Sequence, residues 1–146
     1  MELDKSTQDK IDKLVDEAYE EFQQGKHENS FKLLFDAWAL FPEPKKKWNE
    51  SFNLATYIIN DYLTLDDLAN AEKWLSRLEE IDNNLNISKG TVLFIKGKIS
   101  FEKGEYQSAH ESFKASVKEG EGFRYFEDED PKYLDFYTHP EKYMGG

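Results

Sequence analysis

The chain has 146 residues, a formal net charge of −11 and no cysteine, and 38% of its residues are hydrophobic. This length supports one hydrophobic core, so we expect a single domain over residues 1–146. The absence of cysteine excludes disulfides and thiolate metal sites, and no apolar run approaches the roughly 20 residues that cross a membrane. We therefore expect a cytoplasmic protein that is not exported.

The negative charge bears on the kind of partner. An anionic surface repels nucleic acid and anionic lipid, and it speeds encounter with basic proteins. Many proteins are acidic for solubility alone, so that second interpretation of the charge stays open. We expect no nucleic acid and no membrane as partner, and a basic protein is favoured. Nothing in the sequence indicates an oligomeric state.

Residues 10–42 have the pattern of two helices joined by a short turn. Apolar side chains recur at three- and four-residue steps in the first helix, as expected for one helical face, at Ile11, Leu14, Val15, Ala18 and Phe22. Gly25 marks the turn. The second helix ends before Pro42 because proline lacks an amide hydrogen and restricts the preceding residue. Residues 1–8 are expected to form a frayed leader.

Residues 45–82 repeat this pattern with longer helices. The lysines at 45–47 are expected to solvate a helix start. A helix over about 48–62 is apolar on two faces, so we expect neighbours on both sides of it. Thr64 is the predicted cap of the partner helix, whose apolar stripe is Leu68, Ala71, Leu75, Leu78 and Ile81.

Residues 89–119 form the third and clearest pair. Ser88 is the predicted cap of a helix with an apolar stripe at Val92, Ile95 and Ile99. Gly104 permits a tight turn, and the second helix carries Tyr106, Ala109, Phe113 and Val117. Because Gly97 and Ala109 are small, the two helix axes can approach closely.

The third pair resembles a tetratricopeptide repeat. That family has a glycine in the first helix, a Gly-x-Tyr turn and an Ala-x-x-x-Phe step in the second helix, and the matching residues are Gly97, Gly104, Tyr106, Ala109 and Phe113. The match departs from the family at Leu93, Lys96 and Ser100. The resemblance implies an all-α, right-handed stack of about three helical hairpins of uneven length.

Residues 120–146 form an acidic, aromatic C-terminal segment. Four carboxylates precede Pro131, at Glu127, Asp128, Glu129 and Asp130. Proline at the first helical position and acids at the helix N-terminus both favour a helix start there. We expect a short helix that caps the last hairpin. The alternative is that these four acids and Tyr133 or Tyr137 contact a basic partner, and a cap does not exclude it.

The sequence offers no pattern for catalysis, a metal or a cofactor. His27, His110 and His139 are far apart and lack zinc-site spacing, and no phosphate-binding loop or nucleophile motif occurs. General acid catalysis requires a carboxyl group with a shifted pKa, and carboxylates on helices exposed to water need not have one. We expect a binding module and not an enzyme.

The family resemblance implies a partner on a concave face lined by the first helix of each pair. The candidate residues on that face are Asp16, Glu17, Glu20, Glu21, Asn53, Tyr57, Asn60 and Asp61, followed by Lys96 and Ser100. Our leading hypothesis is an immunity or antitoxin protein that neutralises a basic bacterial toxin domain. The alternative is a tetratricopeptide scaffold or co-chaperone adaptor that holds an extended peptide in the groove.

Overall fold

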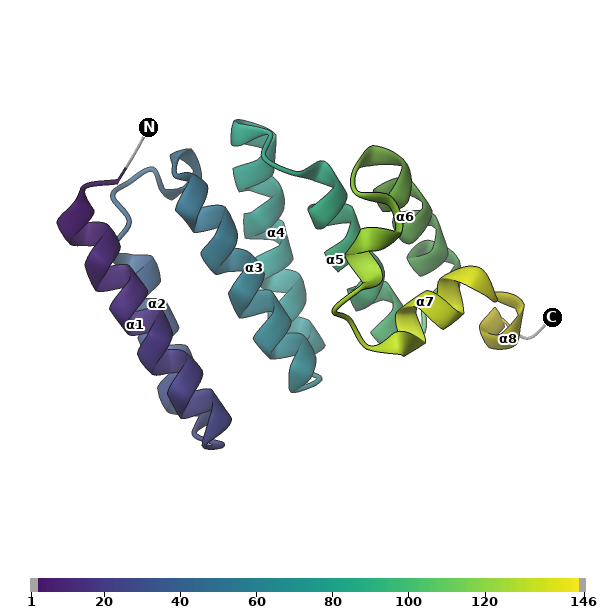
Figure 1. Cartoon of the computed structure of the whole chain (residues 1–146), viewed down its shortest axis with the longest axis horizontal. Coiled ribbons are helices and arrows are strands. Elements are labelled where there is room, and N and C mark those ends of the chain that lie inside the picture. The colour runs from purple at the N-terminus through teal and green to yellow at the C-terminus, as the bar shows by residue number, and fades with distance from the viewer. Residues whose placement is uncertain (1–2, 145–146) are drawn as a thin grey trace.

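The computed structural model describes residues 3–144, and within this range all regular structure is helical (Figure 1). The prediction of an all-α chain is therefore confirmed for the described residues. The helices are α1 Lys5–Gln23, α2 His27–Ala39, the 3-10 helix η1 Lys45–Lys47, α3 Asn49–Thr64, α4 Leu68–Leu85, α5 Lys89–Glu102, α6 Tyr106–Glu119, the 3-10 helix η2 Gly122–Phe126, α7 Pro131–Thr138 and α8 Glu141–Met144.

The six long helices pack as three consecutive pairs: α1 with α2, α3 with α4, and α5 with α6. In Figure 1, α1, α3 and α5 lie towards the viewer, and the second helix of each pair lies behind or beside the first. The chain beyond α6 returns in front of α5 before it ends at the far side of the stack. One face of the molecule is therefore formed by the first helices and part of the C-terminal segment.

The three turns within the pairs have the same geometry. Each contains three residues with a positive φ at the middle position: Gly25 at 80°, Asp66 at 58° and Gly104 at 80°. The residue after it donates its backbone N–H to a carbonyl five residues back, at 2.9 Å in all three turns. Glycine reaches this conformation without steric cost, and aspartate tolerates it better than most residues. The sequence pattern had identified only the two glycine turns.

Two predicted helix starts are wrong. Thr64 is the last residue of α3, and the cap of α4 is Asp67, whose Oδ1 accepts a hydrogen bond from the Asn70 backbone N–H at 3.3 Å. The leader predicted over 1–8 is also too long. Asp4 caps α1 through the Thr7 N–H, so the helix begins at Lys5, and residues 1–2 lie outside the described residues. In both cases an aspartate three residues before a free amide supplies the cap. Ser88 caps α5 as predicted.

Two clusters of buried side chains hold the chain together. The first spans α1 to α5 and contains both Trp48 and Trp74. The second joins the third pair to the C-terminal segment and consists of Phe94, Phe101, Ala109, Phe113, Phe126, Tyr133 and Phe136. A Cβ at Gly97 would lie 2.7 Å from the Phe113 ring, which confirms that α5 and α6 approach closely at this glycine.

The C-terminal segment covers the apolar side of the third pair. Phe136 is fully buried and packs edge-on against Phe101, with ring centroids 5.1 Å apart. Tyr125 lies between Gly90 and Gly120, where a Cβ on either residue would come within 2.1 Å of its hydroxyl oxygen. The predicted short helix after Pro131 is α7, capped by Asp130. Among the described helices, none is long and apolar enough to span a membrane.

Candidate functional site

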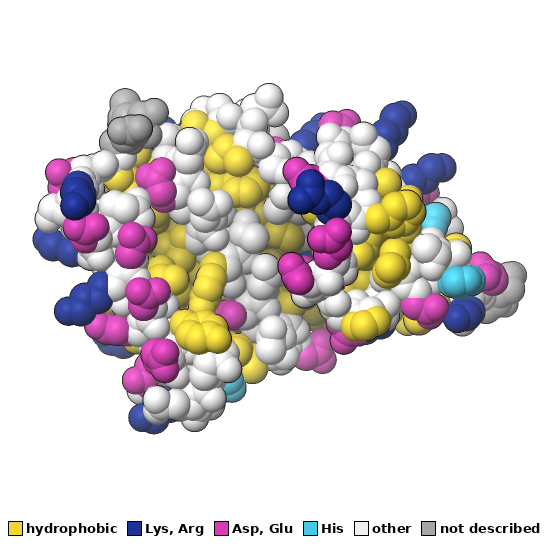
Figure 2. Space-filling model, in the orientation of Figure 1, with side chains coloured by type: hydrophobic (Ala, Val, Ile, Leu, Met, Phe, Trp, Pro, Cys, Tyr) yellow, Lys and Arg dark blue, Asp and Glu magenta, His cyan; other side chains and the backbone are white. Residues whose placement is uncertain are grey.

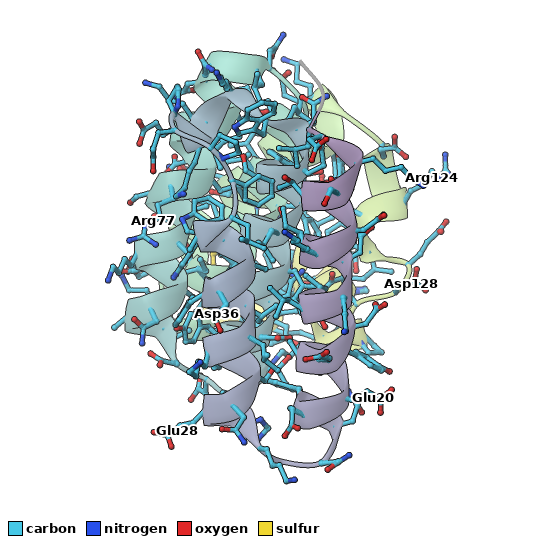
Figure 3. All side chains as sticks on the ribbon, turned by 90° about the vertical axis from the view of Figure 1, so that its left-hand side faces the viewer. Glu20, Glu28, Asp36, Arg77, Arg124 and Asp128 are labelled. Carbon is cyan, nitrogen blue, oxygen red and sulfur yellow. The ribbon has the colours of Figure 1, made fainter. Side chains whose placement is uncertain are left out.

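The face formed by the first helices is hollowed at two places. We name them the α1–α3 groove and the tail pocket, which lies between α3, α5 and the C-terminal segment. Helix α3 contributes to both. Figure 2 shows acidic side chains on this face, with hydrophobic atoms visible between α1 and α3. Figure 3 shows Glu20 of α1 and Asp128 of the C-terminal segment on the same side of the molecule, away from Arg77.

The α1–α3 groove has an apolar floor and an acidic rim. Its volume is about 480 Å³, and its lining is Gln8, Ile11, Asp12, Val15, Asp16, Glu50, Asn53, Leu54 and Tyr57. Ile11 and Leu54 are buried, whereas Asp12 and Asp16 are exposed. The lining contains three carboxylates and no lysine or arginine. This combination suits a long side chain with an aliphatic stem and a cationic end.

A partly buried carboxylate lies beside this groove on α3. Within residues 3–144, Asp61 Oδ2 is buried and has no hydrogen-bond partner. Burial raises the pKa of the Asp61 carboxyl to about 6. Burial, followed by the negative charge of Asp61, also raises the pKa of the Tyr57 phenol. The two groups are therefore close enough to interact, and the carboxylate charge is not neutralised locally.

The tail pocket is built around a buried lysine. Its volume is about 640 Å³, and its lining is Asn60, Leu63, Thr64, Asp66, Lys98, Glu102, Asp128, Glu129, Asp130, Lys132 and Tyr133. Lys98 is only 4% exposed. Its Nζ donates to Asn60 Oδ1 at 2.9 Å and pairs with Glu129 Oε1 at 3.1 Å. The buried charge thereby gains one anionic and one polar partner, as burial requires.

The second lysine of the tail pocket is paired as well. Lys132 lies 2.6 Å from Glu102 Oε1, and the hydrogen bond to Glu102 raises the pKa of Lys132. The same carboxylate oxygen accepts a hydrogen bond from the Tyr133 hydroxyl at 2.8 Å. Burial, and then this hydrogen bond, raise the pKa of Tyr133 above its ordinary value, so the phenol stays a donor at neutral pH.

Once these pairs are made, the pocket keeps unneutralised acids. Asp130 is used as the cap of α7, where it accepts from the Lys132 backbone N–H at 3.0 Å. Asp66 and Asp128 are exposed, and within the part of the chain that the structure describes neither makes a salt bridge. These two carboxylates come from segments far apart in the sequence and face the same pocket.

The structure divides the predicted binding residues between the two hollows. Asp16, Asn53 and Tyr57 line the α1–α3 groove. The tail pocket is lined by five others, namely Asn60, Asp128, Glu129, Asp130 and Tyr133. The remaining predicted residues, which line neither hollow, are Glu17, Glu20, Glu21, Asp61, Lys96, Ser100 and Glu127.

Five of the seven predicted residues that line neither hollow are exposed or lie beside a charged side chain. Glu17, Glu20 and Lys96 are exposed. Glu21 Oε2 lies 4.0 Å from Lys26 Nζ at the α1–α2 turn. Glu127 is exposed and lines a separate hollow beside the exposed Phe123.

Sequence reasoning missed Lys98, Glu102 and Asp66. A signal existed for Lys98, because it stands between the apolar residues Gly97 and Ile99 in a helix with little polar surface, where a charge needs a partner. Its partner, Glu129, is 31 residues away. For Asp66 no such signal existed, since its place in the pocket depends on the chain returning to α3.

The described residues contain no group of three histidine, aspartate or glutamate side chains placed to hold a metal ion. The three histidines lie in different surroundings. His27 packs on Phe22, with centroids 4.5 Å apart, His110 stacks on Tyr137, and His139 lies 3.6 Å from Asp135. Comparison of the chain with protein-family models, curated proteins and solved structures finds no match.

Proposed function

We propose that this chain is a tetratricopeptide-like, non-catalytic interaction module that binds a basic protein through the face formed by α1, α3, α5 and the C-terminal segment. Three turns of one geometry and the close approach at Gly97 support a repeat of this kind. We propose the cytoplasm as its location.

One observation carries the proposed preference for a basic partner. Both hollows are lined by carboxylates, and the only lysines that line them, Lys98 and Lys132, are already paired with Glu129 and Glu102. The face therefore keeps its negative charge. Such a surface attracts cationic side chains and raises the rate of encounter with a basic protein.

A toxin-neutralising protein of the immunity or antitoxin type is the function we favour. A basic nuclease domain binds phosphate groups, and an array of exposed carboxylates can occupy the same cationic surface. Exposed acids on this side of the molecule include Asp16, Asp66 and Asp128. Residues at the two ends of the face would then contact a single partner.

The second candidate is a scaffold or adaptor that holds an extended peptide. The apolar floor of the α1–α3 groove favours it, because Ile11, Val15 and Leu54 offer a surface for every second side chain of an extended peptide. The two functions differ in their salt dependence. Charge-driven binding weakens steeply as salt is raised, whereas binding to an apolar groove changes little.

Affinity capture from cells of the source organism tests the proposal. The full chain is used as bait, bound proteins are eluted by rising salt, and they are identified by mass spectrometry. We expect a basic protein that elutes at moderate salt and is lost when the bait carries Asp16→Asn and Asp128→Asn. Recovery of neutral or acidic partners that resist salt would contradict charge-driven binding and support the adaptor function.

A pair of neighbouring substitutions separates groove contacts from overall charge. Asp16→Asn and Glu17→Gln each remove one negative charge from the same turn of α1, but only Asp16 lines the groove. We expect Asp16→Asn to weaken binding of the captured partner about two- to five-fold, the range of one exposed ion pair, and Glu17→Gln to change it less than two-fold. Isothermal titration at 0.1 M salt measures both. Equal effects would place the contact outside the α1–α3 groove.

A further inference from the structure

Lys98 connects three separate segments of the chain. It lies on α5, and its Nζ contacts Asn60 of α3 and Glu129 of the C-terminal segment. Lysine is almost never buried this completely without partners. A single ammonium group therefore links the C-terminal segment to α3 and α5.

The acidic turn at residues 126–130 is held at both of its ends. Phe126 is buried against Phe94 and Phe113, with ring centroids 4.9 Å and 5.4 Å away. Glu129 is held by Lys98, and its backbone N–H donates to the Phe126 carbonyl at 3.2 Å. Asp128 lies between these two anchors, so its direction depends on both.

The two anchors have different physical roles. The hydrophobic burial of Phe126 and Phe136 is non-directional, so these two side chains keep the segment attached without fixing the rotation of the turn. An ion pair with a buried ammonium group is directional, since its atoms must stay within hydrogen-bond distance. Loss of the ion pair should loosen the turn and leave the rest of the segment in place.

We propose that Lys98 is a positioning residue for partner binding, which holds the acidic turn over α3 and α5 so that Asp128 faces the tail pocket beside Asn60. This inference rests on the proposed function, because it concerns the same acidic face. In this role Lys98 strengthens the binding of a cationic partner, although its own positive charge repels such a partner.

The opposition of these two effects makes a direct test possible. Lys98→Met and Lys96→Met both remove one positive charge from α5, which takes the net charge from −11 to −12. Lys96 is exposed and lines neither hollow. If charge alone governs binding, both variants bind a cationic probe more tightly. If Lys98 positions the turn, only the Lys96 variant does.

The probe is a peptide of nine arginines with blocked ends, and its affinity for the full chain is measured by isothermal titration at low salt. We expect Lys98→Met to weaken binding about two- to five-fold, equivalent to the loss of one exposed ionic contact. Lys96→Met should bind the peptide slightly more tightly, because it removes one positive charge and disturbs no contact of the turn. In an Asp128→Asn background, Lys98→Met should cause no further loss, because both changes remove the same contact.

Amide hydrogen exchange gives a local measure of the turn. The Glu129 backbone N–H is hydrogen-bonded to the Phe126 carbonyl inside the turn, so its exchange rate, measured by nuclear magnetic resonance, should rise several-fold in Lys98→Met and stay unchanged in Lys96→Met. Glu129→Met removes the acceptor of Lys98 Nζ and leaves α5 intact. It should show the same faster exchange and weaker binding than Glu119→Met, which removes an equal charge from the exposed end of α6.

The outcomes separate this inference from the proposed function. Suppose that the wild-type chain binds the peptide. If Lys98→Met binds it equally or more tightly, or if the effects of Lys98→Met and Asp128→Asn on affinity add, the positioning role is overturned and the acidic face stands as proposed. If Lys98→Met does not fold, the comparison of Glu129→Met with Glu119→Met decides the question by the same criteria. Absence of binding by the wild-type chain would overturn the proposed function and the inference together.

Discussion

Replacing Phe113 with alanine should reduce the free energy of unfolding by about 3–5 kcal/mol, which is the usual cost of deleting a buried aromatic side chain. Phe113 is fully buried and contacts the backbone of α5 at Gly97. It also lies at the centre of the aromatic cluster that binds the C-terminal segment, with Phe126 and Phe136 among its neighbours. Its loss therefore affects the third helix pair and the tail pocket together. Urea unfolding followed by far-ultraviolet circular dichroism measures the change.

Phe123→Ala is the matched control for this experiment. It deletes the same side chain from a residue of η2 that is 56% exposed. We expect it to change the free energy of unfolding by less than about 1 kcal/mol. Similar losses for the two variants would mean that the aromatic cluster is not packed as described.

Replacing Asp61 with asparagine should stabilise the protein at neutral pH. Burial raises the pKa of this carboxyl to about 6, from 3.8 in the absence of structure. The folded state therefore holds a proton more tightly than the unfolded state does, and stability is lost as the pH rises through 6. A shift of this size corresponds to about 3 kcal/mol. Because the group is only partly buried, we expect about 1–2 kcal/mol.

The gain from Asp61→Asn should depend on pH. It should be largest above about pH 7, where the folded carboxyl is ionised, and nearly absent at pH 4, where it is protonated. Urea unfolding at pH 4 and pH 8 measures this difference, and Asp16→Asn, at an exposed carboxylate, is the control that should change the free energy of unfolding little. If Asp61→Asn destabilises the protein at pH 8, the Asp61 carboxylate is not an unneutralised buried charge in the folded state.

Such a gain would also bear on function. A chain that keeps a carboxylate at a cost in stability often uses it for binding. We expect Asp61→Asn to weaken the binding of the captured basic partner and to stabilise the free protein. Asp61 is one of the residues that the sequence predicts for the binding face, and its charge acts on the pKa of Tyr57, which lines the α1–α3 groove.

The helical elements could be predicted from the sequence because they depend on local patterns. Stripes of apolar residues, the glycine turns at Gly25 and Gly104 and the Pro131 start of α7 all appear in the structure close to their expected places. The errors at Thr64 and at residues 1–8 concern caps, where several polar residues compete for the same free amides. The turn at Asp66 was missed because a positive φ at aspartate leaves no clear pattern.

The residues that line the two hollows of the proposed binding face could be predicted only in part. Asp16, Asn53 and Tyr57 share a groove because they lie on the exposed sides of neighbouring helices, which periodicity can indicate. The roles of Glu129, Asp130 and Tyr133 differ from that of Asp128, since they form an ion pair, a helix cap and a hydrogen bond within the chain. No spacing in the sequence separates these acids from one another.

The sequence by itself determined the helix pairs, the acidic charge and the aromatic cap of this protein, because periodicity, turn residues and composition act over a few neighbouring positions. Only the tertiary structure decided that the C-terminal acids return to α3, that Lys98 is buried between Asn60 and Glu129, and that Asp66 and Asp128 face one pocket. These contacts join residues 31 or more positions apart. Their pairing follows from how the helices pack, and packing is a property of the whole chain.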